Sequence, residues 1–146
     1  MGLWDPLGLI KDEPGGYVRF KWFRTAEIKH GRIAMLAVTG YLTTAAGIRW
    51  PGLEKFPDGL AAFPAMATDL GDGRNVLAQM IIFMAFAEIV NQEAKYAGIK
   101  QDFIGDFRNE WFDFGWDTFD DATKMRKRNI EINQGRAAMM VRLILT

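Results

Sequence analysis

Two similar decapeptides carry the charged residues of greatest chemical interest in this chain. The first, EIKHGRIAML, spans residues 27–36, and the second, EINQGRAAMM, spans residues 131–140. Each copy places a Glu and an Arg five residues apart beside an apolar segment, and His30 of the first copy corresponds to Gln134 of the second. Carboxylate, imidazole and amide groups all offer a lone pair that a hard cation such as Mg²⁺ can accept. We therefore expect the two copies to present equivalent donors to such a metal.

The Glu and Arg of one copy cannot pair with each other on a helix. Five residues correspond to about 140° around the axis, whereas side chains that face each other lie three or four residues apart. A charge at the centre of a bilayer costs roughly 2.5–3.5 kcal/mol on insertion scales, so these charges must be paired. We predict reciprocal pairs between two helices, Glu27 with Arg136 and Glu131 with Arg32. A purely structural role for these pairs, in helix registry, is the simpler alternative.

Three helices are needed to position these residues. The predicted helices cover residues 22–49, 74–96 and 123–146. The first would be about 42 Å long at 1.5 Å per residue, enough to cross a bilayer core of about 30 Å, and the RWPG sequence at 49–52 is expected to end it. Basic residues precede both decapeptides, so we expect the first and third helices to run parallel and the second to return between them. The segments 51–74 and 97–122 are predicted to be loops.

Composition excludes several other classes of function. The 146 residues fit one domain, 1–146, and the 18 basic and 18 acidic residues leave no net charge, so nothing favours nucleic acid. The sequence has no Cys, no Ser and one His, which excludes a Cys nucleophile and a Ser triad and disfavours zinc. We therefore expect no enzymatic activity. Residues 1–10 show no basic stretch followed by a long apolar one, so we expect no targeting peptide.

Together, the decapeptides resemble the signature helices of the light-harvesting chlorophyll-binding proteins. In that family, E-x-x-H-x-R marks the first membrane helix and E-x-x-[N/H/Q]-x-R the third. The resemblance covers the whole chain in order, including DPLG at 5–8 and FDFG at 112–115. It implies an all-α membrane protein with three transmembrane helices, the first and third crossed and related by a pseudo-twofold axis. Gln134, where land-plant members usually have Asn, resembles the chlorophyll a/c branch of fucoxanthin- and peridinin-type algal antennae.

The resemblance also implies roles for individual residues. It implies axial ligation of chlorophyll magnesium by Glu27, His30, Gln79, Glu88, Glu131 and Gln134. Arg136 would neutralise the carboxylate of Glu27, and Arg32 would neutralise that of Glu131. Simpler interpretations stay open at four of these positions: a hydrogen-bonded helix histidine at His30, a packing polar residue at Gln134, a residue that caps a helix contact at Gln79, and a membrane-edge acid at Glu88.

The function implied by the resemblance is light harvesting in the thylakoid membrane of a plastid. The expected cofactors are chlorophyll a, chlorophyll c and carotenoids of the fucoxanthin or peridinin type and of the diadinoxanthin type. The expected partners are a photosystem core, with photosystem I preferred, neighbouring antenna subunits and thylakoid lipids. Two alternatives stay open: a photoprotective relative that dissipates energy, and a pigment-free helical membrane protein that uses the Glu–Arg pairs for assembly alone.

Overall fold

The computed structural model describes residues 5–8, 16–90, 102–108 and 113–145, and every structural statement below concerns these residues. All described secondary structure is helical, in the order α1 (Gly16–Ala45), η1 (Gly59–Ala61), α2 (Ala62–Thr68), α3 (Asp72–Val90), η3 (Trp116–Thr118) and α4 (Asp121–Leu145). The all-α prediction is therefore confirmed within the described part of the chain. The number of α-helices there is four, one more than predicted.

The end of α1 lies four residues before the predicted end, and a glycine motif ends the helix in place of the RWPG sequence. Gly47 has a positive φ of 80°, and its N–H donates to the Thr44 carbonyl at 3.0 Å. The N–H of Ile48 donates to the Thr43 carbonyl at 3.2 Å. These two bonds and the left-handed glycine form a Schellman motif, which satisfies the last carbonyls of a helix. The prediction that RWPG ends this helix was wrong, and α1 also begins at Gly16, six residues earlier than predicted.

The segment 51–74, predicted to be a loop, contains the short helix α2. Seven residues that include a proline are too few to show a helical period, and Pro64 is tolerated because it lies in the first turn. The next helix, α3, begins two residues before the predicted start because Asp69 caps it. The Gly73 N–H donates to the Asp69 carboxylate at 2.9 Å, which lowers the pKa of that carboxyl group. The predicted extension of this helix over 91–96 lies outside the described residues.

The start of α4 is also set by a cap. The carbonyl of Asp120 accepts the N–H of Lys124 at 2.9 Å, and hydrogen bonding from Thr123 lowers the pKa of the Asp120 carboxyl group. A capping aspartate satisfies one of the N–H groups that the first helical turn leaves unpaired. The helix consequently begins at Asp121, two residues before the predicted start.

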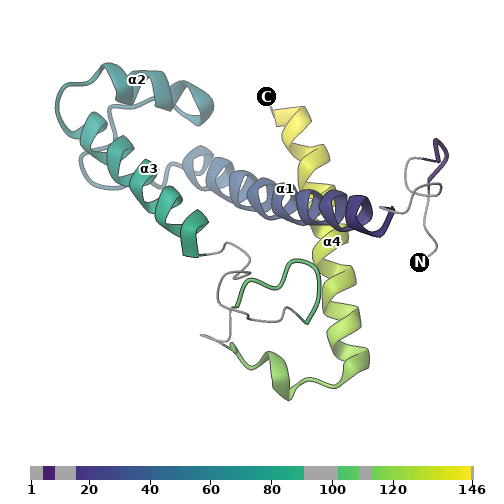
Figure 1. Cartoon of the computed structure of the whole chain (residues 1–146). Coiled ribbons are helices and arrows are strands. Elements are labelled where there is room, and N and C mark those ends of the chain that lie inside the picture. The colour runs from purple at the N-terminus through teal and green to yellow at the C-terminus, as the bar shows by residue number, and fades with distance from the viewer. Residues whose placement is uncertain (1–4, 9–15, 91–101, 109–112, 146) are drawn as a thin grey trace.

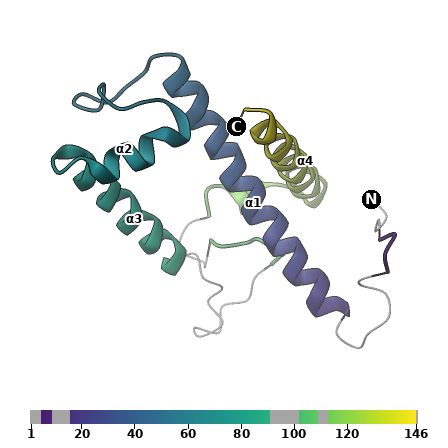
Figure 2. The same cartoon turned by 90° about the horizontal axis from the view of Figure 1, so that it is seen from above.

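The chain packs as two helix pairs (Figures 1 and 2). α1 contacts α4 near the middle of both helices, while α3 lies mainly against α2. The contact between α1 and α4 brings their backbones together, and the distances are nearly equal when measured from either helix. A Cβ atom built on Gly31 would lie 3.0 Å from the Cα of Gly135, and one built on Gly135 would lie 2.9 Å from the Cα of Gly31. Only glycine at both positions permits this approach.

The described residues form almost no apolar core. The buried apolar side chains among them are Ile28, Ala34 and Phe56. By contrast, consecutive residues of α3 from Ile81 to Met84 are each at least 60% exposed, and at 100° per residue they cover the whole circumference. Among the described helices, α3 is the one long and apolar enough to cross a membrane. Most large apolar side chains in the described ranges therefore face outward.

Candidate ligand-binding site

Both predicted cross-helix ion pairs form at the contact between α1 and α4. Arg32 Nε donates to Glu131 Oε1 at 2.6 Å, and Arg136 Nε donates to Glu27 Oε1 at 2.7 Å. The prediction of reciprocal pairing is confirmed. Each pair neutralises a carboxylate through one of its oxygens, and the use of the second oxygen differs between the two copies.

The second oxygen of Glu27 has a partner that the sequence did not predict. Arg24 Nη1 donates to Glu27 Oε2 at 2.8 Å, so this carboxylate lies between two guanidinium groups. Arg128 occupies the same position relative to Glu131, three residues earlier, but its side chain stacks on Phe103 instead. Within the described residues, Glu131 Oε2 accepts no hydrogen bond. Because a carboxylate oxygen carries two lone pairs, both glutamates retain an acceptor position for a cation, and Glu131 is the less occupied.

A segment of irregular backbone, residues 102–108, closes over the Arg32–Glu131 pair. Arg32 Nη2 donates to the carbonyl of Gly105 at 3.0 Å, and its guanidinium lies 5.5 Å from the centre of the Phe107 ring. Gly105 has a positive φ of 92°, and a Cβ atom there would lie 3.0 Å from the Ile28 side chain. The segment therefore needs glycine at this position, and it holds Arg32 in place against Glu131.

Arg108 anchors this segment. Its guanidinium donates two hydrogen bonds of 2.9 Å to the buried carboxylate of Asp106. Three further aspartates lie within 3.5 Å of it: Asp102, Asp113 and Asp117. The bonds from Arg108 lower the pKa of Asp106, and the Asp106 carboxylate raises that of Arg108. Sequence analysis missed this cluster, although Arg108 is the one basic residue between 101 and 123 and had few alternatives to pairing with these acids.

His30 lies exposed on α1 with a defined tautomer. Its Nδ1 is 2.7 Å from the carbonyl oxygen of Ala26, and a carbonyl can only accept, so Nδ1 carries the proton. In the neutral ring Nε2 is then unprotonated, with its lone pair available to a metal. The hydrogen bond thus makes His30 suitable as an axial ligand and does not use its donor atom.

Glu88 on α3 also has a cationic partner from another helix. Lys29 Nζ donates to Glu88 Oε2 at 2.5 Å, which links α3 to the first decapeptide. Three of the predicted ligands are therefore carboxylates paired with a cation across helices. The structure does not bring the amides of Gln79 and Gln134 to these pairs; both are exposed, and no hydrogen bond of either side chain occurs within the described residues.

These donors fit a metal that already has most of its ligands. In the described part of the chain, no three His, Asp or Glu side chains are grouped so as to hold a bare metal ion. A magnesium held by the four nitrogens of a tetrapyrrole needs one axial donor, which a single exposed His Nε2 or a neutralised carboxylate can supply. The arrangement of isolated donors therefore suits chlorophyll.

Comparison with known proteins agrees with this chemistry. The family model described as "Chlorophyll A-B binding protein" matches residues 1–145. The fucoxanthin-chlorophyll a-c binding proteins A and E of Phaeodactylum tricornutum are 49% and 47% identical to the chain, over 96% of its length and 70% of theirs. A fucoxanthin-chlorophyll a-c binding protein of Trieres chinensis is 41% identical over the same shares. The chain therefore belongs to the chlorophyll a-b binding protein family, in its chlorophyll a/c antenna branch.

Proposed function

We propose that this protein is a light-harvesting antenna of the plastid thylakoid membrane, which binds chlorophylls and carotenoids and passes excitation energy to a photosystem. The observation that carries the proposal is the reciprocal pair of neutralised carboxylates at the contact between α1 and α4. A free carboxylate would be costly in a membrane, whereas one paired with Arg is a neutral unit that can still donate to magnesium. Family membership and the exposed His30 donor support the same conclusion.

The outward-facing apolar surface is consistent with a membrane scaffold. In such a scaffold, bound pigments and lipids cover the apolar side chains that the protein itself leaves exposed. A monomeric soluble protein rarely exposes contiguous apolar patches larger than a few hundred Å², yet from Ile81 to Met84 α3 exposes apolar side chains around its whole circumference. We propose that α1, α3 and α4 all span the membrane, with α1 and α4 crossed at Gly31 and Gly135 about a pseudo-twofold axis. The ion pairs would offset the cost of placing charged residues of α1 and α4 in the bilayer. On this proposal the whole chain, 1–146, is one antenna domain.

On this proposal, the magnesium of bound chlorophyll would be held by the side chains of Glu27, His30, Gln79, Glu88, Glu131 and Gln134. Bound chlorophyll supplies the light absorption, and the chain determines where each ring lies. Arg32 and Arg136 orient the two signature carboxylates through charged hydrogen bonds. The Ala26 carbonyl orients His30 by the same kind of outer contact that commonly fixes a metal-binding histidine.

The names of the relatives indicate which pigments to expect. Because these proteins are named for fucoxanthin and chlorophylls a and c, we propose these pigments for this chain and favour fucoxanthin over peridinin. The relatives are also named chloroplastic, which supports the plastid location. A carotenoid of the diadinoxanthin type, neighbouring antenna subunits and photosystem I as the acceptor of energy stay predictions from the family resemblance.

Pigment analysis of the isolated complex tests the proposal. We expect chlorophyll a, chlorophyll c and fucoxanthin in fixed ratios to the protein, and a fully folded colourless protein would overturn the antenna function. Excitation of the carotenoid should produce chlorophyll emission. An emission lifetime much shorter than that of relatives that deliver energy would instead indicate the photoprotective alternative.

Replacement of His30 by Leu tests the ligand assignment. We expect the loss of about one chlorophyll per chain, because the imidazole is the sole axial donor that the variant removes. Thr39→Val is the matched control: Thr39 is exposed on the same helix, and its hydroxyl only bonds back to the Met35 carbonyl. Unchanged chlorophyll content and absorption in the His30 variant would show that His30 is a structural histidine.

A further inference from the structure

Met80 and Met84 of α3 are the one pair of methionines in the sequence that share a helix face at adjacent positions. The chain has eight methionines, and no other two of them lie three or four residues apart. Residues four apart on a helix have Cβ atoms about 5–6 Å from each other. Methionine is unbranched and has three rotatable bonds, so the two side chains can bring their sulfur atoms together on this face.

The face of α3 that carries the pair is the one turned toward other parts of the described chain. Gly73 lies seven residues before Met80 and Glu88 four residues after Met84, so all four residues share this face. Gly73 is buried, and Glu88 pairs with Lys29 of α1. Between them, Met80 is 40% exposed and Met84 is 61% exposed. Both thioethers are therefore accessible to a small molecule.

The pair lies near the middle of α3, whose central residue is 81. In the membrane placement proposed above, this position is deep in the hydrocarbon, where water is scarce. Glu88, a proposed chlorophyll ligand, lies about one helical turn beyond Met84, and side chains on a helix incline toward its N-terminus. Singlet oxygen forms where light excites chlorophyll in the presence of dioxygen. The two sulfur atoms would therefore lie close to a source of this oxidant.

We propose that Met80 and Met84 form an oxidation site at which two sulfides together consume one molecule of singlet oxygen. The lone pair of one sulfur forms an S–O bond to dioxygen and gives a persulfoxide, in which the two oxygens are joined by a single bond. The lone pair of the second sulfur then bonds the terminal oxygen, the O–O bond breaks, and two sulfoxides result. Each sulfur loses two electrons and dioxygen gains four, so the reaction needs no proton and no other reductant.

The second sulfur makes the first step productive. In an apolar medium a persulfoxide without a neighbouring sulfide mainly releases dioxygen again, whereas a sulfide one helical turn away converts it to product. Methionine sulfoxide can be reduced back to methionine by sulfoxide reductases, so the pair removes the oxidant by a reversible change. This inference rests on the proposed function for the source of singlet oxygen and for the apolar surroundings of the pair.

Isotope labelling tests the proposal. The pigment-loaded complex is illuminated under an equimolar mixture of ¹⁶O₂ and ¹⁸O₂ and digested with trypsin, which releases residues 75–95 as one peptide that carries both methionines. We expect the doubly oxidised peptide to carry two identical oxygen isotopes, because both atoms come from one dioxygen molecule. Independent oxidations would give one atom of each isotope in about half of these peptides. That mixed pattern in the wild type would overturn the proposal.

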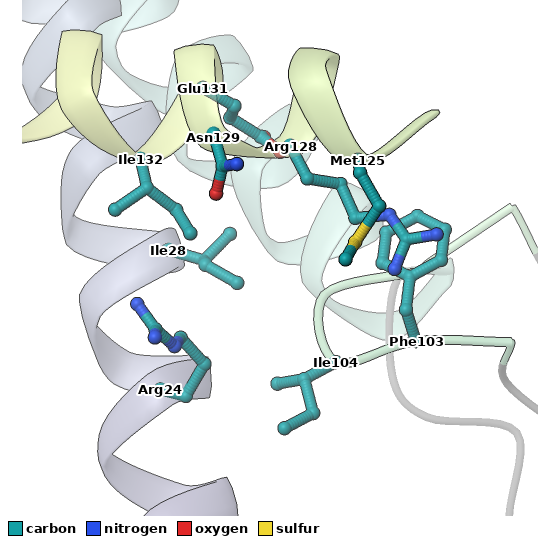
Figure 3. Close-up of a pocket in the computed structure, with 9 residues that line it drawn as sticks. All are labelled: Arg24, Ile28, Phe103, Ile104, Met125, Arg128, Asn129, Glu131 and Ile132. Carbon is teal, nitrogen blue, oxygen red and sulfur yellow. The ribbon is translucent and has the colours of Figure 1, made fainter. Parts of the chain in front are cut away.

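Met80→Leu combined with Ile82→Met is the matched variant. It keeps two methionines on the same peptide, but residues 82 and 84 lie about 200° apart around the helix. We expect mixed isotopes in this variant and at least threefold slower oxidation of Met84; an unchanged rate and pattern would refute the role of the second sulfur. Met125 of α4 provides the reference rate, since it is also 61% exposed and no other residue drawn in Figure 3 is a methionine.

A second source of oxidant separates this proposal from the antenna function. A naphthalene endoperoxide, labelled with either isotope, releases singlet oxygen on warming in the dark and acts on protein with or without pigment. Identical isotopes in this experiment would support the pair even if the protein bound no chlorophyll, which is how failure of the antenna function would show. Oxidation of the pair by the endoperoxide, but not on illumination of the pigmented complex, would overturn the proposal. The wild-type pattern is decisive even if the variant fails to assemble.

Discussion

Replacement of Gly31 by Ala tests whether the backbone contact between α1 and α4 positions the candidate ligands. The added Cβ atom would lie 3.0 Å from the Cα and 3.5 Å from the carbonyl carbon of Gly135. Ordinary contacts begin near 3.4 Å, so the two backbones must separate by about 0.4 Å at this point. The ion pairs on either side, at 2.6 and 2.7 Å, bridge the same gap and would be stretched.

The expected cost follows from the kind of contact involved. Overpacking by one methyl group typically costs about 1–3 kcal/mol, because neither backbone can move freely. Alanine favours a helix over glycine by roughly 1 kcal/mol, which would partly hide that cost. Gly40→Ala is the control that isolates the propensity, because Gly40 lies in the same helix and a Cβ atom there would have no neighbour within 4 Å. We therefore expect the two variants to differ by about 1–3 kcal/mol.

Thermal denaturation of the pigment-loaded complex provides the assay. For a chain of this size, such a difference corresponds to roughly 2–12 °C between the two variants, with Gly31→Ala the lower. The double variant of Gly31 and Gly135 should cost less than the sum of the single changes, because one separation relieves both clashes. Equal denaturation temperatures for Gly31→Ala and Gly40→Ala would refute the reasoning that this contact holds the site together.

Three further predictions concern the ends and the links of the helices. Gly47→Ala should cost about 1 kcal/mol, since alanine is strained at a φ of 80°, and should speed hydrogen exchange at the end of α1. Arg108 lowers the pKa of Asp106, so this carboxylate should stabilise the fold above its usual pKa of about 4 and lose that effect as pH falls through the lowered value. Arg108→Gln should lower the denaturation temperature at pH 7, and that temperature should decrease less on acidification than it does in the wild type. Identical profiles of denaturation temperature against pH for the variant and the wild type would contradict this. Lys29→Leu should lose about one chlorophyll by leaving Glu88 uncompensated, and adding Glu88→Gln should restore it, because an amide is a neutral donor; pigment analysis of both variants decides.

The pairing of Glu and Arg between the two decapeptides could be predicted because the spacing excluded an ion pair within one decapeptide. A Glu and an Arg five residues apart face different directions on one helix, and a second copy of the decapeptide offered the complementary groups. The predicted partners of Glu27 and Glu131 are those observed. The helix ends were less predictable, since Gly47, Asp69 and Asp120 act through a few local capping bonds that leave little trace in the periodicity.

The roles of Arg24 and Arg128 show where the sequence was insufficient. Each lies three residues before its signature glutamate, so the repeat predicts the same contact for both. Arg24 pairs with Glu27, but Arg128 stacks on Phe103. The difference arises because the segment 102–108, which contacts Ile28 and Arg32 of α1, places the ring of Phe103 beside Arg128 of α4.

The sequence by itself determined the helical class, the exchanged Glu–Arg pairs and the identity of the donor groups, because these depend on residue type and on the period of a helix. Only the tertiary structure decided that Arg128 stacks on Phe103 and not on the second oxygen of Glu131, and that Lys29 neutralises Glu88. Those outcomes depend on contacts between residues up to 59 positions apart. No local pattern encodes such contacts, since the competing partners of a charged side chain are chosen by distance in the folded chain.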